Sequence, residues 1–372
     1  MKETPIELLK KLISKKSITP EHDGSIDILS DILSSNGYST KRYDSNGVAN
    51  LWAYNSPNPK LLFAGHVDVV PPGDSDLWDS DPFIAKEKDG FIYGRGACDM
   101  KSALCAMIDA SCRLSKVPGV CLIITSDEEG PALHGTKHVV NELKKLDVKI
   151  PYAIVGEPTC ESKFGDAIKI GRRGSITARF TIFGTQGHVA YPEKADNPVP
   201  KLINALSAIL KSNIVNPIGK NLNFNAETTF LKTGVAENVI PSKVNASVNF
   251  RYSDENGHLT IKELTEKFLE EHAPGMWECE WFHQASPYCF EKESVLVSTL
   301  TDSVFEVCGV KPKPSTAGGA SDGRFLREIC GEICEFGVIN ETIHSPNEKV
   351  HTDEVNKLCD VYFELGNKIL KN

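Results

Sequence analysis

The stretch LLFAGHVDVV, residues 61–70, begins as an uninterrupted apolar run and ends with His66 and Asp68, two residues apart. A short run rich in Leu, Phe and Val is typical of a strand that is covered on both faces, as in a parallel sheet. Pro71 and Pro72 follow and stiffen the exit from the strand. The stretch therefore predicts a buried strand that delivers polar side chains to one edge of a sheet.

Three other apolar runs share this design. They are VCLIITSDEE (120–129), YAIVGE (152–157) and CEFGVI (334–339). Each contains or is soon followed by carboxylates or a histidine, namely Asp127, Glu128, Glu129, Glu157 and His344. Because ligands of open α/β sheets gather outside the carboxyl ends of the strands, we expect these side chains to meet at one edge.

The composition indicates a globular protein of two domains. The chain has 372 residues, of which 40% are hydrophobic and 24% charged, and it is about twice as long as a common domain. Its net charge of −9 and its scattered lysines and arginines disfavour a nucleic-acid partner. No apolar run approaches the length of a membrane span, and the charged N-terminus is unlike a secretory signal. We expect a cytoplasmic protein without nucleic-acid or membrane partners.

The eleven cysteines are expected to be buried, reduced thiols. Their number is odd, most lie in apolar segments, and none belongs to a CxxC pair. A zinc site built from cysteines is therefore disfavoured.

The hydrophobic pattern changes from about Ser175. Strand patterns occur in SITARFTIFG (175–184), TTFLKTG (228–234), VNASVNFRYS (244–253) and MWECEWFHQ (276–284), and helical patterns in PVPKLINALSAILKS (198–212) and LTIKELTEKFLEEHA (259–273). The order βαββαβ is that of the ferredoxin-like unit. We predict an α/β domain over 1–173 and 288–372, with a mixed, mostly parallel sheet and helices on both faces. An inserted ferredoxin-like α+β domain is expected over 174–287.

A helix is also predicted over DMKSALCAMIDASCRL (99–114). Its apolar residues stand at positions 103, 104, 107, 110 and 114, which form one helical stripe. Asp99 precedes the stripe and is expected to be the N-cap.

The histidines and carboxylates at the strand ends indicate a divalent metal site. Zinc binds imidazole nitrogen and carboxylate oxygen, and a catalytic zinc keeps one position open. Each residue alone is weak evidence, because a single histidine after a strand is usually a surface or satisfied side chain. Their occurrence after four apolar runs favours the metal site.

Five motifs, in chain order, carry a resemblance to a known family. They are GHVDVVPPGD (65–74), GRGACDMK (94–101), TSDEEG (125–130), VGEPT (155–159) and TIHSPNE (342–348). Together they resemble the co-catalytic zinc aminoacylase and carboxypeptidase family over nearly the whole chain. The resemblance implies a metal-dependent amide hydrolase.

A second set of motifs narrows the resemblance. GRRGS (171–175), QGHVAYPEKADNP (186–198), NVIP (238–241), NFR (249–251) and GGASDGRF (318–325) are similar to members that remove a succinyl group from a precursor of lysine. Members that remove an acetyl group, other aminoacylases and dipeptidases remain alternatives. A non-catalytic, metal-binding relative is the alternative from another class.

The resemblance implies two zinc ions per subunit, with cobalt or manganese as substitutes. His66, Asp99 and Glu157 would hold one ion, and Asp99, Glu129 and His344 would hold the other. Asp99 would bridge them, because a carboxylate has two oxygens and can bind two ions about 3.5–4 Å apart.

The resemblance also implies three catalytic residues. Glu128 would be the general base. Asp68 would accept the second imidazole N–H of His66 and so orient the ring. His188 would help to stabilise the oxyanion, supplied by the partner subunit of a homodimer that forms through the inserted domain. The inserted domain is also expected to act as a lid.

Substrate choice is expected to depend on arginines, since a guanidinium binds a carboxylate in bidentate fashion. The candidates are Arg172, Arg173, Arg251 and Arg324, with Ser175, Tyr191, Asn238, Gly319 and Asn340 as lesser contacts. Which arginine meets which carboxylate stays open. The sequence departs from the family at Ser102, with little expected consequence, and at Ala320, which lacks a hydroxyl and leaves fine specificity open.

Overall fold

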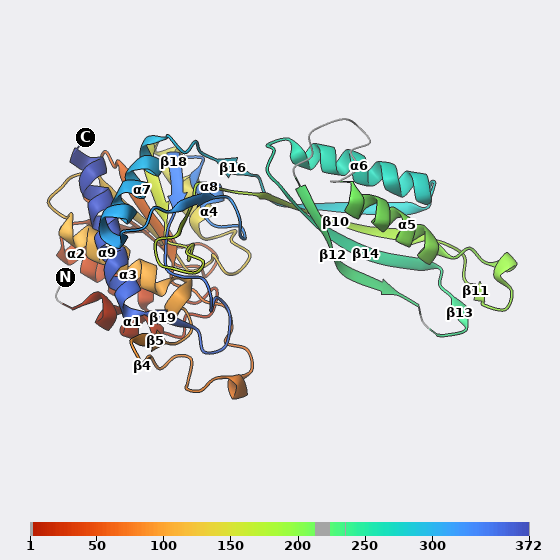
Figure 1. Cartoon of the computed structure of the whole chain (residues 1–372), viewed down its shortest axis with the longest axis horizontal. Helices are drawn as coiled ribbons and strands as arrows, with labels where there is room; N and C mark the ends of the chain where they lie inside the picture. The colour runs from red at the N-terminus through yellow and green to blue at the C-terminus, as the bar shows by residue number, and fades with distance from the viewer. Residues whose placement is uncertain (1–2, 213–223, 235, 372) are drawn as a thin grey trace. The chain divides into compact units, whose positions relative to one another are not determined.

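The computed structural model describes residues 3–212, 224–234 and 236–371, and the chain divides into two units (Figure 1). The first unit comprises residues 1–171, 289–316 and 321–372. The second comprises residues 172–288 and 317–320. The short segment 317–320 therefore belongs to the second unit, although the sequence analysis expected it within the first.

A sheet in the order β1-β2-β6-β3-β7-β18-β8-β17 forms the centre of the first unit. Its strands are β1 (Ser39–Arg42), β2 (Asn50–Tyr54), β6 (Val120–Thr125), β3 (Leu61–His66), β7 (Ile150–Val155), β18 (Cys330–Glu335), β8 (Ala167–Lys169) and β17 (Lys313–Ser315). The pairs β6–β3, β3–β7, β7–β18 and β8–β17 are parallel, and the other pairs are antiparallel. The predicted mixed, mostly parallel sheet is confirmed.

The four apolar runs form the middle of this sheet. Every residue of β3 and β6 is buried, and His66 pairs in register with Thr125. Because β6, β3, β7 and β18 are parallel neighbours, their carboxyl ends lie at one edge, as expected. The fourth strand begins and ends earlier than its apolar run suggests, since the chain leaves the sheet at Glu335. Gly337 then passes so close to the Glu157 carbonyl that a Cβ there would lie 2.4 Å from it.

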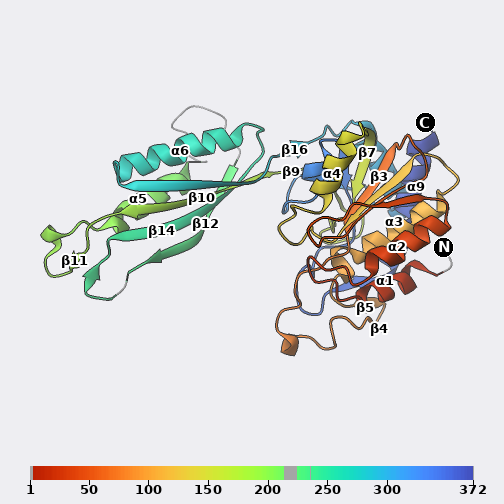
Figure 2. The same cartoon turned by 180° about the vertical axis from the view of Figure 1, so that it is seen from behind.

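Helices cover both faces of the sheet. They are α1 (Pro5–Ile13), α2 (Ser25–Ser35), α3 (Ser102–Arg113), α4 (Thr136–Lys145), α7 (Val295–Cys308), α8 (Gly323–Leu326) and α9 (Thr352–Lys371). α3 and α9 pack on each other and contact β3, whereas α4 contacts β2 and β6. Figure 1 shows α3, α7 and α9 on the near side of the sheet, and α4 is on the near side in the reverse view of Figure 2.

Short elements complete the first unit. β4 (Lys86–Lys88), β5 (Phe91–Tyr93) and β19 (Lys349–His351) form a small antiparallel sheet, and η1 (Ser75–Leu77) and η2 (Ala97–Lys101) are single turns. β9 (Gly171–Arg172) pairs with β16 (Tyr288–Cys289) where the chain passes between the units. The eleven cysteines are free, and eight of them are buried.

The predicted helix over 99–114 begins three residues later than expected. α3 starts at Ser102 with Lys101 at the cap position, and Asp99 has extended dihedrals of φ −117° and ψ 101°. Asp99 is therefore not an N-cap, and that expectation is wrong. The backbone N–H of Asp99 instead donates to the Glu348 carboxylate at 2.9 Å, which keeps η2 apart from the helix.

The second unit has the predicted ferredoxin-like order. Its elements are β10 (Gly174–Phe183), α5 (Pro198–Lys211), β12 (Phe224–Thr233), β14 (Lys243–Tyr252), α6 (Gly257–His272) and β15 (Trp277–Ala285). They form an antiparallel sheet in the order β12-β14-β10-β15. A two-stranded antiparallel sheet of β11 (Gly187–His188) and β13 (Val239–Ile240) extends from it, next to the turn η3 (Pro192–Lys194). Among the described residues, no helix of the chain is long and apolar enough to cross a membrane.

Candidate active site

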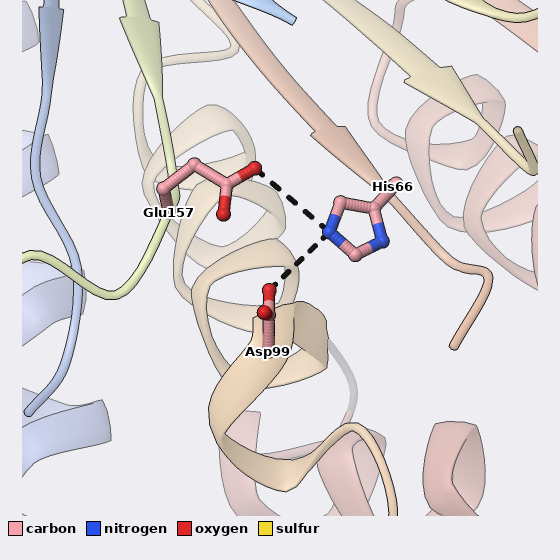
Figure 3. Close-up of side chains that lie close together, drawn as sticks. All are labelled: His66, Asp99 and Glu157. Carbon is pink, nitrogen blue, oxygen red and sulfur yellow. Dashed lines mark ion pairs between the residues drawn. The ribbon is translucent and has the colours of Figure 1, made fainter. Parts of the chain in front are cut away.

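Three of the expected metal ligands meet at the carboxyl edge of the central sheet (Figure 3). His66 is the last residue of β3, Glu157 follows β7, and Asp99 lies in η2. The Nε2 atom of His66 lies 3.4 Å from Asp99 Oδ1 and 3.9 Å from Glu157 Oε1. Figure 3 shows both carboxylates directed at this one ring nitrogen.

The other carboxylate oxygen of Asp99 belongs to a second group. Asp99 Oδ2 lies 3.4 Å from His344 Nε2, which lies 2.9 Å from Glu129 Oε1. Glu129 stands in the loop after β6, and His344 stands after β18 with a left-handed φ of 58°. In each group the ligand atoms all lie within 4.8 Å of one another. The two groups thus share Asp99, with one oxygen directed into each.

The residues of the first group fit a divalent cation. His66 Nε2, Asp99 Oδ1 and Glu157 Oε1 are buried and have no hydrogen-bond partner among the residues that the structure describes. Leaving buried polar atoms unpaired costs about 1–3 kcal/mol each, so three such atoms that converge on one point indicate a missing partner. One imidazole nitrogen and two carboxylate oxygens are a donor set that suits zinc.

In the metal-free chain, the histidines and carboxylates of this site shift one another's pKa values. Burial alone would lower the pKa of His66, but Asp99 and the charges of neighbouring carboxylates outweigh burial and raise it well above its usual value. Hydrogen bonds with Asp99 and Glu129 raise the pKa of His344 to about 10. Burial would raise the pKa of Asp99, but the two histidines lower it. His344 is therefore a positively charged imidazolium at pH 7 when no metal is bound.

We expect metal binding to release at least one proton per chain at pH 7. A metal binds neutral imidazole, whereas His344 stays protonated up to a pH of about 10 in the metal-free chain. Metal affinity should therefore fall as the pH is lowered. Calorimetric titration in buffers of different ionisation enthalpy measures the released protons, and binding without proton release at pH 7 would contradict this assignment.

Asp68 orients His66 through its main chain rather than its side chain. The Nδ1 of His66 lies 2.8 Å from the carbonyl oxygen of Asp68 and 3.6 Å from its carboxylate. The carboxylate instead accepts the backbone N–H groups of Glu128, at 3.2 Å, and Glu129, at 3.1 Å. The expected side-chain contact is therefore corrected: the short turn of the chain brings the carbonyl nearer to the ring than the carboxylate. Asp68 still fixes the ring and also anchors the loop that carries Glu128 and Glu129.

Glu128 lies on this loop, next to the candidate ligand Glu129, and is half-buried. Burial raises the pKa of its carboxyl well above the usual value, and the charge of His66 opposes the rise. The carboxylates of Asp322, Glu129 and Asp99 raise it further. A carboxyl group with a raised pKa is suited to accept and return a proton.

The second unit holds two separate groups of expected substrate contacts. The first is at the start of β10 and the end of β14 and comprises Arg172, Arg173, Ser175, Arg251 and Gly319. The Nη1 of Arg172 donates to the carbonyls of Ala317 and Gly319, at 3.3 and 3.2 Å. Arg251 donates to Asn249, and burial together with the nearby Arg173 lowers its pKa. The two bonds of Arg172 attach the segment 317–320 to the second unit.

The second group lies at the other end of the same strands. His188, Tyr191 and Asn238 are exposed, and the rings of His188 and Tyr191 lie 6.0 Å apart. Val189 donates its N–H to the carbonyl of Asn238. The strands β10 and β14 are ten residues long, so about 30 Å separates the two groups within one chain.

Two expected substrate contacts belong to the first unit. Arg324 lies in α8 and stacks its guanidinium over Phe325, 4.6 Å from the ring centre. Asn340 donates its backbone N–H to the carbonyl of Cys160 at 2.9 Å. The structure gives no contact that joins these two residues directly.

The sequence analysis missed the buried ion pair of Arg95 and Glu348. The Arg95 Nη1 lies 2.8 Å from Glu348 Oε2, and both side chains are almost fully buried. Both residues stand inside motifs that were singled out, GRGACDMK and TIHSPNE. The sequence does show a charged residue near the expected ligands in each motif, which could have drawn attention to both. It does not show that the two residues pair, because 253 positions separate them.

The fold and this site define the class of protein. The chain belongs to peptidase family M20/M25/M40, whose model matches residues 62–368, and it is a hydrolase that acts on an amide. Several curated relatives carry the name succinyl-diaminopimelate desuccinylase, and two of them show the extent of the likeness. The one from Coxiella burnetii is 40% identical over 98% of each chain. The one from Nitratiruptor sp. is 41% identical over 97% of this chain and 98% of its own length.

Solved structures share the fold at low sequence identity. Aminopeptidase PepT from Bacillus cereus has a TM-score of 0.82 at 18% identity and covers 99% of each chain. The YXEP protein of Bacillus subtilis, described as a dinuclear metal-binding peptidase of the M20 family, has a TM-score of 0.75 at 15% identity. That match covers 99% of this chain and 98% of the YXEP chain. The predicted fold class is confirmed by these likenesses.

Proposed function

We propose that the protein hydrolyses N-succinyl-LL-2,6-diaminopimelate to succinate and LL-2,6-diaminopimelate, a step of lysine biosynthesis. The observation that carries the proposal is the pair of ligand groups that share Asp99, in a chain 40% identical to named desuccinylases. Two zinc ions are the proposed occupants, with cobalt or manganese as substitutes. A cytoplasmic location belongs to the same proposal.

The proposed mechanism assigns a task to each residue of the metal centre. When bound, the two ions supply Lewis-acid polarisation of the scissile carbonyl and lower the pKa of the attacking water. His66 and Glu157 would hold one ion, Glu129 and His344 would hold the other, and Asp99 would contribute to both sites. Glu128 accepts a proton from the attacking water and later returns it to the leaving amine. Asp68 keeps the ring of His66 and the loop of Glu128 in place.

A homodimer would bring the two distant groups of the second unit to one substrate. Succinyl-diaminopimelate is much shorter than the roughly 30 Å between the arginine group and the His188 group of one chain. If both groups contact one substrate molecule, they come from different subunits. The strand β12 supports pairing through this unit, since within the described residues it is an edge of the sheet and exposes Phe230 and Leu231.

His188 is well prepared to stabilise the oxyanion. The backbone N–H of Ala190 donates to its Nδ1 at 3.1 Å, so the neutral ring carries its proton on Nε2. That N–H is an exposed donor, and removing one such donor costs roughly 10²–10³-fold in kcat.

We therefore expect His188→Ala to lower kcat by about 10²-fold while metal content and light-scattering mass stay unchanged. Val189→Ala, which shortens the exposed neighbour, is the matched control and should keep native kinetics. A His188→Ala rate within a factor of a few of the native rate would remove this role. A protein that is monomeric and active at the assay concentration would contradict the proposal that two subunits share one active site.

Substrate choice separates the proposed activity from its alternatives. Initial rates of amine release from N-succinyl-LL-diaminopimelate and from N-acetylornithine would be compared under one condition. We expect turnover of the succinyl substrate alone, because arginines can bind its terminal carboxylate. Turnover of acetylornithine alone would keep the amide hydrolase and overturn the proposed substrate.

A further inference from the structure

The side chain of Glu348 is only 1% exposed, and its carboxylate accepts four hydrogen bonds from within the protein. Its Oε1 accepts the backbone N–H groups of Cys98 and Asp99, at 2.8 and 2.9 Å. Its Oε2 accepts the backbone N–H of Gly96 and the Nη1 of Arg95, at 2.9 and 2.8 Å. The carboxylate thus holds the backbone of η2, the turn that presents Asp99.

Arg95 makes the corresponding contacts with the loop of His344. Besides Glu348, its guanidinium donates to the carbonyls of Ser345 and His344, both at 3.3 Å, and of Pro71 at 3.4 Å. It also stacks over Trp78, 5.2 Å from the ring centre. A planar guanidinium with several donors can serve such a set, whereas an ammonium is a single point.

We propose that the Arg95–Glu348 pair is the positioning element that sets the distance between Asp99 and His344. Neither residue belongs to one of the two ligand groups. Asp99 lies in the turn η2 and His344 in a loop, whereas His66 is held in place by the strand β3. The Arg95–Glu348 pair therefore fixes the backbone at Asp99 and His344, as β3 fixes it at His66. The inference deepens the proposed function and rests on its two-metal centre.

The pair determines metal binding in two ways. Glu348 holds the backbone of the shared ligand, so both metal groups depend on it. Arg95 reaches the main chain of His344, so the group of Asp99, Glu129 and His344 depends on it more than the other group does. Residues that orient metal ligands typically change affinity by about 10–100-fold when they are replaced.

The first test is Glu348→Gln, studied by calorimetric titration of the metal-free protein with Co²⁺. The amide keeps the size of the side chain, but its NH₂ would face the donors of Gly96 or Arg95 in place of an acceptor. We expect both equivalents to bind about 10–100-fold more weakly. A folded variant that binds both within threefold of native would overturn the inference.

The second test is Arg95→Lys, which keeps the charge opposite Glu348 and loses the planar fork. We expect one Co²⁺ equivalent to weaken about 10–100-fold and the other to change by less than threefold. The absorption spectrum of the Co²⁺ ion at the weakened site should shift, because the ligands of that ion change position. Equal weakening of both equivalents, no change, or a failure to fold would each overturn the proposed division of roles, the last because the pair would then support the whole unit.

Asn55→Ala is the matched control. Asn55 also anchors a loop, through the N–H groups of Gly119 and Val120 and the carbonyl of Val117, at the opposite end of the strands. It should lower the melting temperature without changing Co²⁺ affinity. Titration of the native protein distinguishes a failure of the proposed function from a failure of this inference. If the native protein binds fewer than two Co²⁺ equivalents, the two-metal centre itself is refuted. If it binds two and the variants bind Co²⁺ equally well, only this inference is refuted.

Discussion

Glu128→Ala is expected to lower kcat by about 10³-fold while the protein still binds two metal equivalents. General acid–base catalysis contributes typically about 10²–10⁴-fold, and Glu128 is a carboxyl next to the ligand Glu129 that belongs to neither ligand group. Burial raises the pKa of Glu128 well above the usual value of a carboxyl, which makes it a better proton acceptor than an exposed glutamate. Steady-state kinetics together with metal analysis of the same sample measure both quantities.

Glu129→Ala provides the comparison for this result. The two glutamates are adjacent in sequence, but Glu129 lies 2.9 Å from His344 in the second ligand group. We expect its variant to lose a metal equivalent as well as activity. If Glu128→Ala keeps full turnover, or if it loses metal as Glu129→Ala does, the assignment of Glu128 as the base is wrong.

Asp99→Asn is expected to have the second largest effect. The carboxylate directs one oxygen at each histidine, 3.4 Å from His66 and 3.4 Å from His344. An amide has a single acceptor oxygen and no charge, so it cannot bridge two cations. We expect metal content to fall to one equivalent or less and kcat/KM to fall by about 10³-fold or more.

Asp109→Asn makes the same chemical change on the far part of α3. Asp109 forms an i,i+4 pair with Arg113 and should keep native metal content and kinetics. Two tightly bound equivalents in Asp99→Asn would show that this residue does not bridge. Metal analysis after gel filtration gives the answer independently of activity.

The strand ends and the ligand set could be predicted from the sequence because they depend on local patterns. An apolar run such as 61–66 defines a buried strand, and the residue after it, or at its end, is placed at the edge of the sheet. Parallel order then brings the ends of β6, β3, β7 and β18 together. The gathering of His66, Asp99 and Glu157 follows from this topology and from the position of η2.

Other features depend on contacts that the sequence does not encode locally. Asp99 precedes an apolar helical stripe, as an N-cap does, but Glu348 holds its backbone and the helix begins at Ser102. Asp68 was expected to reach His66 with its carboxylate, whereas the backbone carbonyl of Asp68 lies nearer to the ring. Residues 317–320 join the second unit because Arg172 binds their carbonyls, a contact that spans about 145 positions.

The central claim is that the shared-aspartate centre of this chain drives hydrolysis of N-succinyl-LL-diaminopimelate. Its most direct test is the rate of amine release from this substrate after complete chelation and during stepwise return of Zn²⁺. We predict no measurable turnover in the metal-free protein and full recovery at two equivalents per chain. Undiminished turnover without metal, or no turnover of this substrate with two equivalents bound, would contradict the account.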